Sequence, residues 1–265
     1  MPGFWSEVEL QRELAEAALI VVATQRDAVE TAFQCCHTNR TADRARRVQP
    51  PVPIPASWYD QDYFERGIKS NWSEGYRWEL FSGLFRGTAS FLTSMFPRAS
   101  SFLDIGCSKG FLVRCLRESG KACWGLDFSP WAIEHADSLA APFLQLAALD
   151  DYPFDRRFDV LLAFSLLESL TEAQINHFLT RAKAAAGTAL LAVIPSFETP
   201  EEERRFRRED NDLSHITLRS RQWWHERFLE CGWRHDAAIE ALRRRCQSAP
   251  LPVQMGWKIY VYAPG

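Results

Sequence analysis

The sequence predicts an α/β protein with a doubly wound, mostly parallel sheet of seven strands that ends in a C-terminal antiparallel hairpin. Three observations carry this prediction. Short apolar runs alternate with segments of helical periodicity beyond residue 100. Acids and glycines stand where the first two apolar runs end. A proline-rich stretch at 50–55 separates these elements from an earlier part of helical character, which predicts an N-terminal helical extension.

Composition limits the classes of function. The 265 residues are 46% hydrophobic and 25% charged, as in globular proteins, and a net charge of −3 gives no reason to expect a nucleic-acid partner. The apolar run at 17–23 is too short to span a bilayer and lacks the features of a secretory signal, so we expect no membrane partner. The seven cysteines form no C-x-x-C pair, which favours a reduced, cytoplasmic protein without a metal site.

Three segments follow one another. Residues 1–50 are expected to form the N-terminal helical extension, with amphipathic helices over 6–37 that could support a homodimer. Residues 51–98 hold a dense group of Trp and Tyr side chains between Trp58 and Trp78, followed by a helix over 80–95. Such a group is either core packing or a cap over a ligand. The sheet domain should occupy 99–265.

The sheet elements alternate in order. Parallel strands are expected at 101–106, 122–127, 143–149, 159–165 and 188–196. Helices are expected at 110–120, from Pro130 onward, at 172–186 and at 221–231. Two final strands, 234–242 and 257–262, are predicted to pair as the antiparallel hairpin.

The stretch LDIGCSKG at 103–110 is the most informative part of the sequence. A buried strand ends in Asp104, Gly106 permits a tight turn, and Gly110 lets the next helix pack close to the strand. The following strand ends in a second acid, Asp127, at the distance where a nucleotide-binding sheet places a carboxylate for ribose hydroxyls. The sequence therefore predicts a nucleotide-type site at this edge of the sheet.

Two details favour S-adenosylmethionine (SAM) over NAD. A dinucleotide motif would read G-x-G-x-x-G, whereas Gly106 and Gly110 are separated by Cys107, Ser108 and Lys109. The carboxylate of Asp104 in the turn would repel a pyrophosphate but attract a cationic methionine moiety.

On these residues, positions 99 to about 196 resemble a class I SAM-dependent methyltransferase with a Rossmann-like fold and a D-x-G-x-G-x-G motif. Ser108 replaces the middle glycine of that motif, and the acid common just before Leu149 in the family is Ala148 here. The resemblance implies that SAM is bound by Asp104, Gly106, Cys107, Ser108, Lys109, Gly110, Asp127, Phe128, Leu149, Asp150, Phe164 and Ser165. The aromatic segment is similar to methyltransferases of bacterial biosynthetic and polysaccharide gene clusters, which implies that Tyr63, Trp72 and Tyr76 close over SAM.

A base is needed only if the acceptor atom is protonated, as a hydroxyl is. Glu168 lies where the family often has Glu-His, with Ser169 in place of the histidine; it is either a base or a carboxylate at a helix start. His215, with Asp212 three residues earlier, lies in a long loop and either acts as a base oriented by that acid or belongs to a simple turn. These three residues are the catalytic candidates.

Acceptor contacts are expected from Trp223 or Trp224, for which core packing is the alternative. The arginines at 204–208 either pair with the acids at 201–203 along a helix or recognise an anionic group of the acceptor.

The sequence thus predicts a SAM-dependent methyltransferase that acts on a small-molecule acceptor, a metabolite or sugar-like compound in biosynthesis, at a hydroxyl oxygen. Two alternatives stay open: an enzyme that acts on SAM itself without a second acceptor, and a non-catalytic SAM-binding regulatory subunit.

Overall fold

The computed structural model describes residues 49–245 and 257–265. The helical extension predicted for 1–50, and any dimer contact through it, therefore lies almost wholly outside the described residues. Within the described part, no helix is both long and apolar enough to cross a membrane.

The described strands form one mixed sheet in the order β3-β2-β1-β4-β5-β8-β7, and β6 pairs with β5 beside this path. Their bounds are β1 Ser101–Ile105, β2 Ala122–Asp127, β3 Leu144–Leu146, β4 Phe158–Phe164, β5 Ala186–Phe197, β6 Arg219–Ser220, β7 Trp233–Arg234 and β8 Trp257–Pro264. Strands β1 to β6 pair in parallel, whereas β8 is antiparallel to both β5 and β7. The doubly wound sheet with an antiparallel C-terminal end is confirmed, and β6 is one short strand more than the seven expected.

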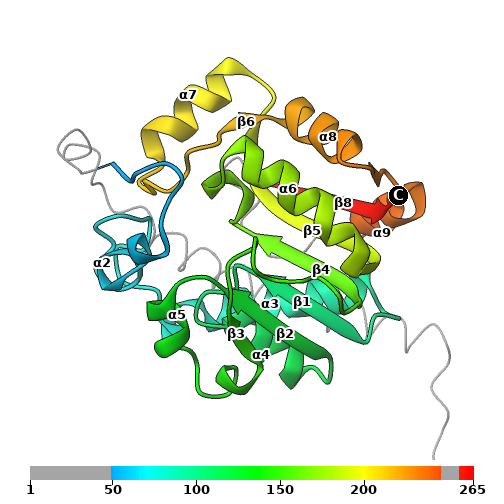
Figure 1. Ribbon diagram of the computed structural model, residues 1–265, viewed down its shortest axis with the longest axis horizontal. Coiled ribbons are helices and arrows are strands. Elements are labelled where there is room, and N and C mark those ends of the chain that lie inside the picture. Colours follow the sequence, from blue (N-terminus) through cyan, green and yellow to red (C-terminus); the bar gives the residue numbers. More distant parts are fainter. Residues whose placement is uncertain (1–48, 246–256) are drawn as a thin grey trace, which may run out of the picture.

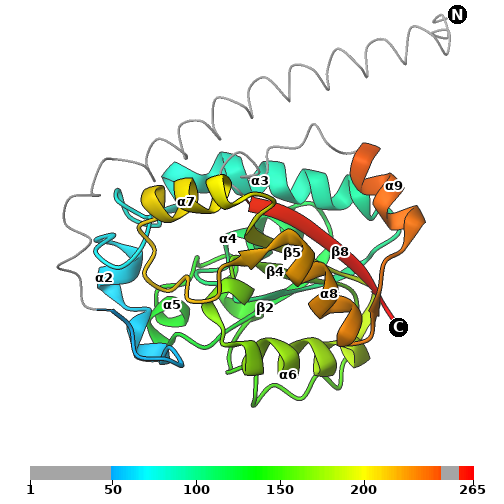
Figure 2. The same cartoon turned by 90° about the horizontal axis from the view of Figure 1, so that it is seen from above.

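Helices cover both faces of this sheet (Figures 1 and 2). The described helices are α2 Gln61–Phe64, α3 Trp78–Met95, α4 Phe111–Glu118, α5 Pro130–Glu134, α6 Glu172–Ala182, α7 Pro200–Glu209, α8 Arg221–Glu230 and α9 Ala237–Arg245. Figure 2 shows α3 on one side of the sheet and α6 on the other. Short 3₁₀ turns at Ala56–Trp58, Ala141–Phe143, Leu167–Ser169 and Lys183–Ala185 complete the connections.

The strands alternate their side chains between two apolar cores. In β4, Val160 and Leu162 pack with α3 and α4, whereas Leu161 and Ala163 pack with α6 and α8. This alternation follows from the period of two along a strand, and both sets are apolar because both faces are covered. The carboxyl ends of the parallel strands lie side by side, and the loops that follow these strands meet there.

The strand predicted for 234–242 is largely a helix. Only Trp233–Arg234 pairs with β8, and α9 begins at Ala237. The segment AAIEALRRR is rich in Ala, Leu, Glu and Arg, which are strong helix formers, and Asp236 accepts hydrogen bonds from the backbone N–H groups of Ala238 and Ile239. Helix propensity outweighed the hairpin pattern here.

The aromatic segment after residue 50 forms a separate apolar cluster beside the strand ends. Its buried members are Ile54, Trp58, Tyr63, Phe64, Tyr76 and Phe81, packed with Phe111, Ala132 and Leu213. Phe64 stacks on Trp131 of α5 at 5.3 Å between ring centroids, which places α2 beside α5 (Figure 1). We call residues 54–77 the cap.

Candidate functional site

The β1–α4 turn is a tight backbone loop at the carboxyl end of β1. Gly106 has a φ of +76°, and the backbone N–H groups of Gly106 and Cys107 donate to the carbonyl of Leu126 at 2.8 and 3.0 Å. A Cβ on Gly106 would lie 3.1 Å from the side chain of Leu166. The turn therefore needs glycine both for its backbone conformation and for the close approach of the chain after β4.

Gly110 begins α4 with a φ of +79°. A Cβ there would lie 2.7 Å from Cβ of Ala140, so glycine allows the helix to approach the segment that precedes β3. Lys109 is nearly buried; its Nζ donates to the carbonyl of Tyr76 at 3.3 Å and lies 5.1 Å from the ring centre of Trp131. Lys109 therefore joins the turn to the cap.

Asp127 ends β2 and presents a buried carboxylate beside this turn. One of its oxygens accepts from the backbone N–H of Ser108 at 2.8 Å, and the other accepts from that of Ser129 at 2.8 Å. Burial raises the pKa of Asp127, although these backbone donors oppose the rise. The donors orient the carboxylate, as a site that recognises ribose hydroxyls requires.

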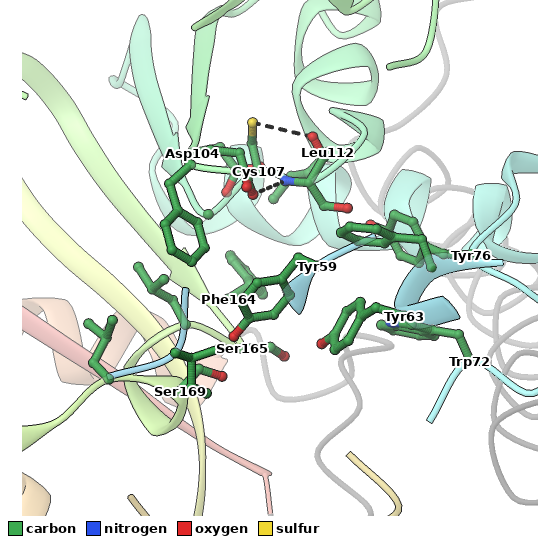
Figure 3. A pocket seen from close by; sticks show the side chains of 18 of the residues that line it. Tyr59, Tyr63, Trp72, Tyr76, Asp104, Cys107, Leu112, Phe164, Ser165 and Ser169 are labelled. Carbon is green, nitrogen blue, oxygen red and sulfur yellow. Dashed lines mark hydrogen bonds between the residues drawn. The ribbon is translucent and has the colours of Figure 1, made fainter. Parts of the chain in front are cut away.

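A cavity of about 200 Å³ opens between the strand ends and the cap (Figure 3). Strand ends and loops contribute Asp104, Gly106, Cys107, Ser108, Asp127, Phe128, Phe164, Ser165, Leu166, Ser169 and Leu170 to its wall. The cap and the helices contribute Ile54, Tyr59, Tyr63, Phe64, Trp72, Tyr76, Leu84, Phe85, Thr88, Leu112 and Gln174. Ser108 and Ser165 both have positive φ, and such backbone strain gathers at functional sites.

The described wall of the cavity holds carboxylates and no basic side chain. Among the described residues that line the cavity, Asp104 and Asp127 carry carboxylates and none is Lys, Arg or His. Burial, with the neighbouring charge of Asp127, raises the pKa of Asp104 to about 7. A cationic ligand would offset the cost of both buried carboxylates. The sulfonium and ammonium groups of SAM therefore suit this wall, whereas a pyrophosphate does not.

The structure brings many of the sequence-predicted SAM contacts together at this cavity. Asp104, Gly106, Cys107, Ser108, Asp127, Phe128, Phe164, Ser165, Tyr63, Trp72 and Tyr76 all line it. Lys109, Gly110, Leu149 and Asp150 do not. The carbonyl groups of Leu149 and Asp150 instead accept hydrogen bonds from Arg181 of α6 at 2.9 and 3.0 Å.

Hydroxyl groups gather across the cavity from Asp104 and Cys107 (Figure 3). Tyr59 and Tyr63 extend from the cap, 4.7 Å apart between ring centroids, with their hydroxyl ends toward the side that holds Ser169. Burial raises the pKa of both tyrosines, so their hydroxyl groups are protonated at neutral pH. Tyr59 and Ser169 were missed by sequence reasoning, although Tyr59 shares the aromatic segment from which Tyr63 was chosen.

The three catalytic candidates lie together behind this wall rather than in it. The Nε2 atom of His215 is 3.7 Å from Glu168 and 3.8 Å from Asp212, and its Nδ1 atom is 2.8 Å from Asp210. Burial lowers the pKa of His215, but Asp210 and Asp212 more than offset this and raise it to about 10. Burial raises the pKa of Glu168 to about 8. At neutral pH, His215 is therefore a cation and Glu168 is protonated, so neither is in the form of a base.

The tryptophans expected at the acceptor lie elsewhere. Trp224 is fully buried in the core between the sheet and α8, and Trp223 packs at the edge of that core. Neither lines the cavity. The acids and arginines at 201–208 lie on α7, where Arg207 pairs with Glu203 at 2.8 Å. This agrees with the first of the two predicted roles, pairing of acids and arginines along a helix.

In residues 49–245 and 257–265, no group of three or more His, Cys, Asp and Glu side chains is arranged to hold a metal ion.

Comparisons with known proteins agree with this geometry. Residues 76–246 match the family model described as a methyltransferase domain. No curated protein sequence matches the chain. Among solved structures, the human N-acetylserotonin methyltransferase in complex with SAM has a TM-score of 0.54 at 14% identity, covering 85% of this chain and 65% of its own.

Two bacterial structures are similar to the same degree. A putative O-methyltransferase from Nostoc punctiforme has a TM-score of 0.51 at 13% identity, covering 89% of this chain and 69% of its own. A TehB-like SAM-dependent methyltransferase from Corynebacterium glutamicum has a TM-score of 0.50 at 17% identity, covering 68% and 88%. These likenesses show the fold, and the family match covers most of the chain. The chain belongs to the methyltransferase-domain family and is a class I SAM-dependent methyltransferase.

Proposed function

We propose that this enzyme methylates a hydroxyl oxygen of a small, uncharged acceptor with a flat phenolic ring. The observation that carries the proposal is the composition of the cavity wall: aromatic side chains, hydroxyl groups at the end opposite Asp104, and no basic side chain among the described lining residues. SAM supplies an electrophilic methyl group when it is bound.

The wall disfavours acceptors that carry a phosphate or carboxylate group. Phosphate and carboxylate groups are normally recognised by Arg or Lys, and none lines the cavity in the described part of the chain. Asp104 and Asp127 would repel an anion in addition. An uncharged acceptor meets neither obstacle.

The shape and polarity of the acceptor end favour a flat ring over a sugar. Tyr59, Tyr63 and Phe164 offer aromatic faces, whereas a sugar needs a partner for each of several hydroxyl groups. A phenol needs one such partner, which the hydroxyl groups near Ser169 supply.

In this proposal, SAM binds between the cap and the β1–α4 turn. The turn from Gly106 to Ser108 holds the methionine moiety, Asp127 holds the ribose, and Phe128 lies beside the adenine. Tyr76 and Trp72 close the cavity from the cap side, where both pack on Phe81 of α3. The main contribution to rate is then alignment and exclusion of water.

The test is a product screen with purified enzyme and SAM. The acceptors are 4-cyanophenol and 2-naphthol, with methyl glucoside as the sugar and phenyl phosphate as the anion; S-adenosylhomocysteine and methylated products are measured by mass spectrometry. We expect methyl ethers of the two phenols. Methylation of the sugar or the anion alone would overturn the acceptor class. Methylthioadenosine formed without an acceptor would indicate chemistry on SAM itself, and binding without any product would indicate a regulatory subunit.

A further inference from the structure

We infer that Tyr63 and Asp212 form a proton relay, in which the Tyr63 hydroxyl takes the proton of the acceptor hydroxyl and passes its own proton to Asp212. The inference rests on the proposed function, because only a protonated acceptor atom needs a base.

The relay is a direct contact between the cavity wall and the buried acid. Tyr63 lines the cavity, and its Oη donates a hydrogen bond to Oδ2 of Asp212 at 2.7 Å. Asp212 is 5% exposed and does not line the cavity. A proton that leaves the acceptor can therefore reach this carboxylate through Tyr63 without passing through solvent.

The other oxygen of Asp212 is already occupied. Its Oδ1 atom accepts from the backbone N–H of Ser214 at 2.9 Å and from the Ser214 hydroxyl at 2.6 Å. These two donors fix the carboxylate plane, and they leave Oδ2 as the oxygen that faces Tyr63. The carboxylate is thus held in one orientation, as efficient proton transfer requires.

The charged and titratable groups around Asp212 come from three parts of the chain. Tyr59 and Tyr63 face it from the cap, Glu168 from the turn after β4, and Asp210 and His215 from its own loop. Burial raises the pKa of Asp212, with Asp210 acting in the same direction and His215 opposing. Asp212 therefore takes up a proton more readily than an exposed carboxylate does, while the His215 cation, 3.8 Å away, keeps the anionic form accessible.

The step balances. The acceptor oxygen forms a bond to the methyl carbon as the carbon–sulfur bond breaks, and that electron pair stays on sulfur. The acceptor proton goes to Oη of Tyr63, and the Tyr63 proton goes to Oδ2 of Asp212. The negative charge of Asp212 and the positive charge of the sulfonium are both lost, so no new net charge arises in the buried site.

The first experiment compares phenol with 4-nitrophenol as acceptors at a pH where only 4-nitrophenol is ionised. The variants are Tyr63→Phe and Asp212→Asn. Tyr260→Phe is the matched control, because Tyr260 also donates a buried 2.7 Å hydrogen bond, to Ser196, away from the cavity. We expect kcat/KM with phenol to fall by about 10²- to 10⁴-fold in both variants, and by less than about tenfold with 4-nitrophenol. The control should keep its activity with both.

The second experiment needs no turnover. Bound to the complex with S-adenosylhomocysteine, 4-nitrophenol reports its own ionisation by absorbance. We expect its apparent pKa to be higher in the parent than in Asp212→Asn, because the nearby carboxylate disfavours a second negative charge. Tyr260→Phe should give the parent value.

The outcomes separate the two proposals. Equal losses of activity with phenol and 4-nitrophenol, or an unchanged pKa of the bound nitrophenol in Asp212→Asn, would overturn the relay while leaving hydroxyl methylation intact. Failure of the parent enzyme to methylate either phenol, with SAM bound normally by calorimetry, would instead overturn the proposed acceptor class. Thermal melting of Asp212→Asn and Tyr63→Phe separates loss of folding from loss of chemistry. If one variant fails to fold, the other still tests the relay.

Discussion

The Nδ1 atom of His215 lies 2.8 Å from a carboxylate oxygen of Asp210, and the two side chains are 4% and 1% exposed. Asp210 also accepts a hydrogen bond from Asn71 of the cap at 2.9 Å. This pair therefore joins the loop before β6 to the cap, and its imidazole lies 3.8 Å from Asp212, the hydrogen-bond partner of Tyr63. A buried pair of this kind contributes to stability only while both partners keep their charges.

Asp210→Asn should destabilise the fold by about 3–5 kcal/mol, because it leaves the His215 cation buried beside a neutral amide. Urea unfolding at pH 7 measures the loss. The matched control is Glu203→Gln, which removes an exposed pair with Arg207 on α7 and should cost about 0.5 kcal/mol or less. Similar losses in the two variants would contradict the importance of the buried pair.

Stability should fall in alkaline solution. The pKa of His215 is raised from 6.5 in the unfolded chain to about 10 in the fold, so its contribution is complete below pH 6.5 and is lost as the pH rises through about 10. Unfolding free energies measured at pH 6, 8 and 10 test this. A His215→Gln variant should show a shallower decline over that range; an equal decline would assign the effect to other groups.

Glu168→Gln should stabilise the protein at neutral and alkaline pH. The unfolded chain loses the Glu168 proton near pH 4.5, whereas the fold keeps it up to about pH 8, so the parent loses stability across this window. The amide resembles the protonated form and carries no such cost. We expect the advantage of the variant to grow from pH 4.5 to 8 and to reach on the order of 1–3 kcal/mol. Catalysis that survives the substitution would exclude Glu168 as a required base.

Asp127→Asn should weaken SAM binding by roughly tenfold to a hundredfold, the usual effect of losing hydrogen bonds to a charged group. Isothermal calorimetry with SAM measures it. Asp159→Asn is the matched control. Asp159 also accepts backbone hydrogen bonds, from Ser100 and Ser101, but it lies at the opposite end of the strands, away from the cavity. An unchanged affinity in Asp127→Asn would place the ribose elsewhere.

Gly106→Ala and Gly120→Ala separate backbone strain from steric conflict. Both glycines have positive φ, +76° and +78°, so each substitution should cost roughly 1–2 kcal/mol of stability. A Cβ at Gly120 meets nothing within 4 Å, whereas one at Gly106 meets Leu166 at 3.1 Å. We therefore expect weaker SAM binding only in Gly106→Ala. Equal affinities in the two variants would show that the turn does not contact SAM.

The strand pattern made much of the sheet predictable. The limits expected for β2, 122–127, match the structure because alternating apolar residues end in a clear acid–proline boundary, and Asp104 and Asp127 meet because neighbouring parallel strands end at one edge. These signals are local in sequence and need no knowledge of distant contacts.

The acceptor end of the cavity could not be predicted in the same way. Tyr63 meets Asp212, and Asn71 meets Asp210, across more than a hundred residues of chain, so no local periodicity reports these contacts. The sequence left Trp224 as either an acceptor contact or a core residue, and only its packing shows that it is fully buried in the core. The roles of such residues follow from packing, which the sequence pattern alone does not describe.

The acidic wall formed by Asp104 and Asp127 has a consequence for turnover. SAM carries one more positive charge than S-adenosylhomocysteine, because its sulfur is a sulfonium before transfer and a neutral thioether afterwards. Buried carboxylates interact with that charge at short range and with little screening by salt. In the proposed binding mode, the wall would therefore attract SAM more strongly than S-adenosylhomocysteine, and charge alone would favour the exchange of product for new SAM after each reaction.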